Sequence, residues 1–222
     1  MDIFVSKFVN SIIDNLDHKD LVSLDKLKLS KDTQPDLTHW NAFLKRHKNP
    51  TCEVTVGLVG KYVELQDSYK SISESFIHAS SFLRCKVNLH WICSENLDAT
   101  SAIESLKNMD GVLVAPGFGP RGIDGMVRCA NYAREKNIPY LGLCLGMQIM
   151  VIEYSRNVLN LKDANSSEFD QNSKNLVIDF LPGQMKLKET GASMRLGNYP
   201  CVINKNSKVF NCYNSTEITE RH

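Results

Sequence analysis

Cys144 lies between two glycines in the sequence Gly142-Leu-Cys144-Leu-Gly146, a spacing typical of a nucleophile that is held on a sharp turn. An apolar run ends at Leu143 and a helix-like run begins at Met147, so the pattern predicts a strand, the turn and then a helix. Glycines on both sides leave room for the backbone of such a turn, and the N-terminus of a helix favours a thiolate over a thiol. The sequence therefore predicts a cysteine nucleophile for acyl transfer, in preference to a buried structural cysteine.

A second loop that contains glycines, Val114-Ala-Pro-Gly117-Phe118-Gly119, follows a predicted buried strand. In an α/β protein the loops at the carboxyl ends of the strands bind ligands, whereas the simplest alternative is an ordinary turn. The backbone N–H groups of Gly117 and of Leu145, just after the cysteine, are the natural pair to hold a developing oxyanion. We therefore expect Gly117 and Leu145 to lie together beside Cys144.

The elements that must position these loops alternate along the chain from Val54 onwards, short apolar runs with amphipathic stretches. This alternation is typical of an α/β fold in which helices cover both faces of an open, mostly parallel sheet. The expected strands are residues 54–59, 86–93, 111–114, 140–143, 176–180 and 194–203, and the expected helices are residues 68–82, 100–107, 125–136 and 147–154. A long loop is expected over residues 162–170, and short helices are expected around residues 4–16 and 36–44.

Length and composition narrow the class of protein. With 222 residues, 42% of them hydrophobic, the chain can bury one full-sized core, and a net charge of +1 argues against nucleic acid or a membrane surface as its main partner. No targeting segment or membrane span is expected. The seven cysteines are scattered, odd in number and without a C-x-x-C pair, which favours a reducing cytoplasm and predicts no metal site.

Several motifs together carry a resemblance to a known family. Two of them are the turn Gly142-Leu-Cys144-Leu-Gly146, here called the elbow, and the loop Val114-Ala-Pro-Gly117-Phe118-Gly119, here called the Gly117 loop. The others are Gly60-Lys-Tyr-Val-Glu-Leu-Gln-Asp-Ser-Tyr-Lys70, Asp163-Ala-Asn-Ser-Ser-Glu168-Phe and Met194-Arg195-Leu-Gly197. In these motifs the chain resembles the glutaminase domain of the CTP synthase family, a class I glutamine amidotransferase with a flavodoxin-like fold. The resemblance covers residues 51–222 as an amidotransferase domain that is incomplete at its C-terminus, and it implies that residues 1–50 are the helical tail of a synthase domain with its linker.

The resemblance implies a glutaminase reaction that supplies ammonia for pyrimidine nucleotide biosynthesis. Cys144 would attack the side-chain amide of glutamine, and water would then release glutamate from the thioester. The ammonia would convert UTP to CTP in the synthase domain of the whole enzyme, which would use ATP and magnesium, while this chain would hold no cofactor. GTP would act as an effector, and the family forms homotetramers.

Site residues follow from the resemblance by position. Gly117 and Leu145 would form the oxyanion hole, and Tyr62, Lys70 and Arg195 would take part in the response to GTP. The glutamine pocket would be lined by Gly117, Phe118, Leu145, Gly146, Met147, Gln148 and Glu168, the last of which would hold the ammonium group. The plain alternative for each charged residue is a solvated surface position that makes at most a weak ion pair.

Two departures from the family pattern affect these expectations. The family usually has two glycines before the phenylalanine of the oxyanion loop, whereas here the order is Ala115-Pro116-Gly117-Phe118, which keeps the second glycine. The histidine and glutamate of the family's triad would follow His222, so the chain as written is expected to have little or no glutaminase activity. The alternatives are an inert regulatory or binding module derived from the same family and another cysteine hydrolase on the same scaffold.

Overall fold

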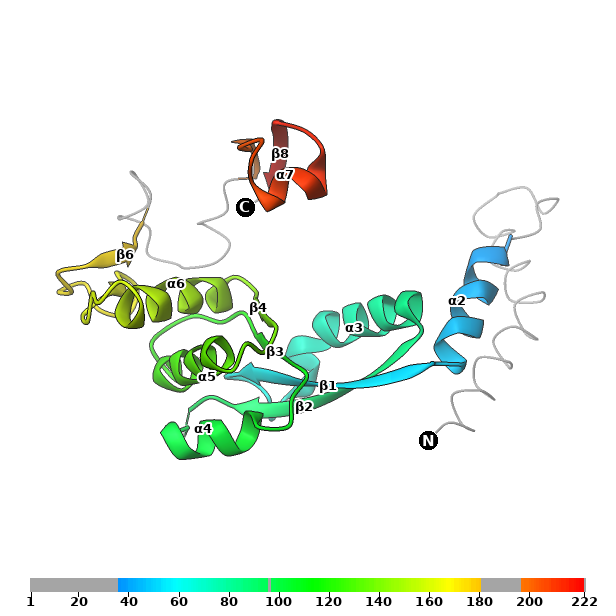
Figure 1. Ribbon diagram of the computed structural model, residues 1–222, viewed down its shortest axis with the longest axis horizontal. Coiled ribbons are helices and arrows are strands. Elements are labelled where there is room, and N and C mark those ends of the chain that lie inside the picture. Colours follow the sequence, from blue (N-terminus) through cyan, green and yellow to red (C-terminus); the bar gives the residue numbers. More distant parts are fainter. Residues whose placement is uncertain (1–35, 96, 181–196, 222) are drawn as a thin grey trace, which may run out of the picture.

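A sheet of four parallel strands organises the fold (Figure 1). The computed structural model describes residues 36–95, 97–180 and 197–221. The strands are β1 (Cys52–Gly60), β2 (Cys85–Cys93), β3 (Gly111–Val114) and β4 (Tyr140–Gly142), and their order across the sheet is β2-β1-β3-β4. All three pairings are parallel, as the alternation of apolar runs with amphipathic stretches predicts.

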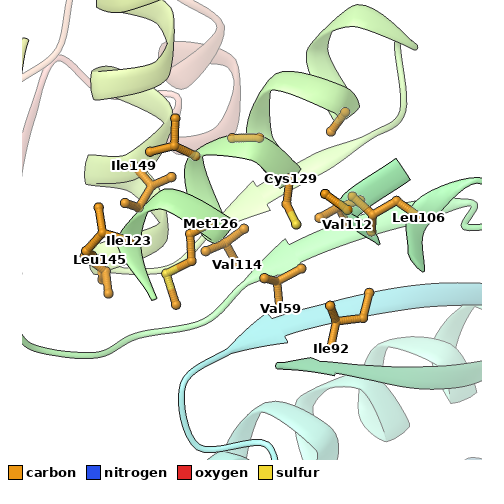
Figure 2. Close-up of a cluster of buried hydrophobic side chains, with 14 of the residues drawn as sticks. Val59, Ile92, Leu106, Val112, Val114, Ile123, Met126, Cys129, Leu145 and Ile149 are labelled. Carbon is orange, nitrogen blue, oxygen red and sulfur yellow. The ribbon is translucent and has the colours of Figure 1, made fainter. Parts of the chain in front are cut away.

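Helices cover both faces of this sheet, which confirms the expected fold class. The one-turn helix η1 (Gln66–Tyr69) and α3 (Lys70–Leu83) pack on one face, and α4 (Ala99–Leu106), α5 (Ile123–Glu135) and α6 (Leu145–Asn157) pack on the other. Because successive strand residues point to opposite faces, Leu58 contacts the α3 side, whereas Val59 belongs to the larger core under α4, α5 and α6. Figure 2 shows this larger core, with Leu145 and Ile149 of α6 beside Met126 of α5.

The second half of the chain differs in part from the expectation. The expected strand at residues 176–180 is present as β6 (Leu176–Ile178), but it pairs with β5 (Asn165–Ser166) in a separate two-stranded sheet. β5 lies inside the stretch 162–170 that the sequence predicts as loop, so that prediction is wrong at those two positions. Two polar residues carry no apolar periodicity, and only the contact with β6 reveals them as a strand.

A β-hairpin and a short helix follow near the end of the described chain. β7 (Asn198–Val202) pairs in antiparallel fashion with β8 (Glu217–Arg221), and α7 (Lys208–Tyr213) lies between them in the sequence. β7 agrees with the described part of the expected strand 194–203, whereas α7 and β8 were not expected. No described helix has the length and apolar character needed to cross a membrane.

One helix precedes the sheet and packs on α3. α2 (Thr38–Lys48) confirms the expected helix at 36–44 and extends it by about one turn. The ring of Phe43 lies 5.2 Å from that of His78 on α3, and Ser81 Oγ donates a hydrogen bond of 3.0 Å to the carbonyl oxygen of Phe43. The helix expected around residues 4–16 lies outside the described residues.

Candidate functional site

Cys144 occupies a strained turn between β4 and α6. Its backbone angles are φ 54° and ψ −104°, a region that residues other than glycine rarely adopt, and its side chain is exposed. A Cβ on Gly142 would lie 2.4 Å from the carbonyl carbon of Gly146, and one on Gly146 would lie 2.2 Å from the carbonyl oxygen of Val114. Only glycine therefore fits at the two positions that flank the cysteine, in agreement with the sequence pattern.

Hydrogen bonds fix the elbow to β3 and to the first turn of α6. Leu143 N–H donates to the carbonyl oxygen of Val114 at 3.1 Å, and the carbonyl oxygen of Cys144 accepts from Met147 N–H and Gln148 N–H at 3.1 and 3.2 Å. Leu145 is the first residue of α6, so its N–H has no acceptor within the helix. The side chain of Leu145 is buried in the core that Figure 2 shows, which anchors this amide next to the cysteine.

The Gly117 loop lies beside the start of α6. A Cβ on Gly117 would lie 3.3 Å from Leu145 Cδ2 and 3.3 Å from Lys61 Cδ, so the structure brings Gly117 and Leu145 together as expected. Phe118 and Met147, two of the residues assigned to the glutamine pocket, are 52% and 50% exposed. The Gly117 loop and the first turn of α6 thus pack against each other, and each presents an exposed apolar side chain, Phe118 from the loop and Met147 from the helix.

Lys61, at the end of β1, binds the backbone of the Gly117 loop. The sequence does not predict it as a site residue. Its side chain is only 4% exposed, and its Nζ donates hydrogen bonds to the carbonyl oxygen of Phe118 at 2.8 Å and to that of Gly119. Burial lowers the pKa of Lys61 below its ordinary value, and the negative charge of Glu168 opposes this effect. The signal available in the sequence is that Lys61 directly follows β1, at the edge of the sheet where the loops bind ligands.

Glu168 contacts the same loop from the other direction. Its Oε1 accepts a hydrogen bond of 2.7 Å from Gly119 N–H, and the side chain is partly buried. Glu168 is therefore not the solvated surface acid of the plain alternative. Lys61 and Glu168 together hold the backbone of Phe118 and Gly119 through both carbonyl and amide groups.

Another contact reaches the loop through Tyr69. The hydroxyl of Tyr69 accepts a hydrogen bond from Lys61 N–H at 3.2 Å and donates one of 3.4 Å to the carbonyl oxygen of Pro116. A Cβ on Gly60 would lie 2.7 Å from this hydroxyl, so any other residue at position 60 would displace the Tyr69 ring. The end of β1, η1 and the Gly117 loop are thereby joined.

The two described residues assigned to a GTP response, Tyr62 and Lys70, each contact other residues rather than one another. Tyr62 carries the guanidinium of Arg121 over its ring, with 5.4 Å between Arg121 Cζ and the ring centroid. Lys70 is exposed, and its Nζ pairs with Glu74 at 2.8 Å on its own helix rather than with the loop. Arg195 lies outside the described residues.

The described part of the chain offers neither a metal site nor a histidine beside the nucleophile. No cluster of three or more His, Cys, Asp or Glu side chains suited to a metal occurs among the described residues. The described histidines lie on α2, α3 and β2, and within these ranges none of them forms a hydrogen bond with Cys144. His18 and His222 lie outside the described residues.

Comparison with known proteins places this site in a family. Residues 64–222 match the model of the family described as glutamine amidotransferase class-I. The chain belongs to the class I glutamine amidotransferases. This result agrees with the resemblance that the elbow and the Gly117 loop carry, and it covers β3, β4 and α6, which position them.

Curated relatives of this amidotransferase chain are called CTP synthase. One from Flavobacterium psychrophilum is 55% identical over 203 residues, which is 91% of this chain and 38% of the relative. Another from Cytophaga hutchinsonii is 46% identical over 234 aligned residues, 99% of this chain and 43% of the relative. The chain thus spans about two fifths of the length of these relatives.

A solved structure shares the fold and much of the sequence of this amidotransferase. It is the glutaminase domain of Trypanosoma brucei CTPS with bound acivicin. The TM-score is 0.66 and the sequence identity 38%, over 76% of this chain and 66% of that one.

Proposed function

We propose that this chain is the glutaminase part of a CTP synthase and that Cys144 is its nucleophile. The observation that carries the proposal is the exposed Cys144 in the strained turn at the start of α6, with Leu145 as the first helical residue and Gly117 packed against the Leu145 side chain. The names of the curated relatives support the choice of CTP synthase among the glutamine amidotransferases. Residues 51–222 are proposed as the amidotransferase domain and residues 1–50 as the tail of a synthase domain with its linker.

The proposed reaction runs through a thioester. The Cys144 thiolate attacks the side-chain carbonyl carbon of glutamine, the C–N bond breaks, and the amide nitrogen leaves as ammonia after it takes up a proton. Water then attacks the thioester and releases glutamate, which restores the thiol. In both steps negative charge develops on the carbonyl oxygen, where the N–H groups of Gly117 and Leu145 stabilise it.

The remaining pocket residues are assigned to the substrate. Phe118, Met147 and Gln148 border the side chain of glutamine, and the free oxygen of the Glu168 carboxylate faces its ammonium group while Oε1 holds Gly119 N–H. Because the described histidines lie on α2, α3 and β2, we propose that the general base comes from outside the described residues, and that these residues alone hydrolyse glutamine slowly or not at all.

The proposal extends to the whole enzyme. Ammonia passes to a synthase domain in which ATP and magnesium support the amination of UTP to CTP, and this takes place in the cytoplasm in a homotetramer. GTP acts as an effector near Tyr62, whose ring already carries the Arg121 guanidinium. Lys70 and Arg195 are assigned to the same response by resemblance alone.

Acivicin, an electrophilic glutamine analogue, provides the test. The complete gene product that contains this chain is incubated with acivicin, with and without excess glutamine, and the modified residue is located by peptide mass spectrometry. We expect one adduct, on Cys144, that glutamine suppresses and that the Cys144→Ser variant does not form. The Cys212→Ser variant, which changes another exposed cysteine, is expected to label like the unmodified protein.

Two outcomes would count against the proposal. An adduct on another cysteine would remove Cys144 from the role of nucleophile. Rapid alkylation of Cys144 by iodoacetamide combined with no reaction with acivicin would show a reactive thiol without a glutamine pocket.

A further inference from the structure

Cys52 and Cys85 are neighbours at the N-terminal ends of β1 and β2, whereas Cys144 follows the C-terminal end of β4. They are the first residues of β1 and β2, and the register of these parallel strands pairs them directly. Side chains of residues paired in this way point to the same face. Neighbouring strands lie about 4.8 Å apart, within the roughly 4.4–6.8 Å between Cα atoms that a disulfide bridges. Both thiols are free in this structure.

The surroundings of the two sulfurs differ. Cys52 is exposed, whereas Cys85 is partly buried. The Cys52 thiol beside it raises the pKa of Cys85 to about 11, which reflects the close approach of the two sulfurs. Each thiol also lies near a backbone carbonyl oxygen, Cys52 Sγ at 4.0 Å from that of Arg84 and Cys85 Sγ at 3.7 Å from that of Lys86.

We propose that Cys52 and Cys85 form a reversible disulfide when the protein meets a peroxide, independently of the glutaminase reaction. The exposed Cys52 thiolate attacks one oxygen of hydrogen peroxide, the O–O bond breaks, and a sulfenic acid forms on Cys52 with release of hydroxide, which takes up a proton from solvent. The Cys85 sulfur then attacks the Cys52 sulfur. The S–S bond forms, the S–O bond breaks, and the proton of Cys85 leaves with the hydroxyl group as water.

The cross-link would join the two strands at the point where each begins. It would close a loop of roughly 30 residues that contains β1, η1 and α3. This loop includes Lys61 and Tyr69, which support the Gly117 loop. The oxidised protein would thus differ from the reduced one by a link between β1 and β2, with the nucleophile at the other edge of the sheet left out of it.

The test uses a Cys144→Ser background, so that peroxide does not react with the nucleophile. The protein is treated with a small excess of hydrogen peroxide, free thiols are blocked with N-ethylmaleimide, and a non-reduced tryptic digest is analysed by mass spectrometry. We expect a peptide pair that joins Cys52 to Cys85, which dithiothreitol separates. The melting temperature should rise on oxidation by roughly 5 °C or more, because the link restricts the unfolded chain.

Matched variants decide between this pair and other thiols. Cys52→Ser and Cys85→Ser should each abolish both the linked peptide and the rise in melting temperature. Cys93→Ser, at the other end of β2 with Gly60 as its register partner, should leave both unchanged. Recovery of Cys52 and Cys85 as separately blocked thiols, or a disulfide between other cysteines with no Cys52–Cys85 link, would overturn the proposal.

Discussion

Replacing Gly146 with alanine tests whether the close approach of α6 to β3 determines the elbow. The new Cβ would lie 2.2 Å from the carbonyl oxygen of Val114 and 3.0 Å from Val114 Cβ. Carbon and oxygen normally stay about 3.3 Å or more apart, so the overlap is roughly 1 Å. The obstacle is a main-chain atom of β3 and cannot rotate away, so the start of α6 must move and take Cys144 with it.

The size of the effect follows from two opposing contributions. Overpacking in a rigid interior costs about 1–3 kcal/mol and sometimes more, and contact with a backbone atom places this variant at the upper end. The better helix propensity of alanine returns at most about 1 kcal/mol. We expect the free energy of unfolding to fall by about 2–3 kcal/mol and the melting temperature by roughly 8 °C.

Urea unfolding followed by far-UV circular dichroism measures this difference, with Gly111→Ala as the matched control. A Cβ on Gly111, also part of β3, would lie 3.7 Å from its nearest neighbour, which is ordinary contact. That variant should unfold within about 1 kcal/mol of the unmodified protein. If Gly146→Ala and Gly111→Ala unfolded at the same urea concentration, the steric account of the elbow would be refuted.

Three further predictions concern buried polar groups. Lys61→Met should slow acivicin labelling of Cys144 by about tenfold, because the variant loosens the loop that carries the Gly117 amide, whereas loss of a full oxyanion donor costs a hundredfold or more. Iodoacetamide labelling of this variant should stay unchanged, and so should acivicin labelling of the control variant Lys70→Met. An equal loss with both reagents would show general damage to the protein instead. Glu153 is buried, which alone would raise its pKa, but hydrogen bonds from Arg134, Asn131 and Asn157 outweigh burial and lower it. Its stabilising contribution is therefore present above about pH 4.5 and lost as the pH falls through the lowered value. In urea unfolding, Glu153→Gln should lower the free energy of unfolding by about 2 kcal/mol at pH 7 and by progressively less towards pH 3. A difference between the two proteins that did not depend on pH would contradict this account. Burial raises the pKa of Cys129 to about 12. In native protein at pH 8, iodoacetamide should therefore alkylate Cys144, and it should reach Cys129 only after unfolding. Early adducts on Cys129 in a time course would argue against its burial.

The core of the fold was predictable because its apolar periodicity is strong and local. Local sequence is enough to predict β3 at Gly111–Val114, which is a short apolar run, and α5, whose apolar residues recur at helical spacing. The elbow belongs to the same class, since glycine, cysteine and glycine at fixed spacing report a backbone geometry directly. These segments also led to the expectation that Gly117 lies beside Leu145, and the two residues do pack together.

Contacts between distant segments could not be predicted in the same way. The position of Lys61 directly after β1 indicates only which edge of the sheet it occupies, and not that its ammonium group binds the carbonyl groups of Phe118 and Gly119, more than fifty positions away. Glu153 likewise meets Arg134 and Asn131 across two helices. Such polar pairs form because the fold buries them together, so they become visible only once α5, α6 and the loops are placed.

The contacts at Gly142 and Gly146 also determine how the gene can change. Every other amino acid carries a Cβ, and at these two positions the Cβ itself would lie within 2.5 Å of backbone atoms. All missense mutations in either codon therefore meet the same obstacle before the size, charge or polarity of the new side chain matters. In a deep mutational scan for function, nearly every substitution at these two positions should be deleterious, whereas Gly111 should tolerate small residues.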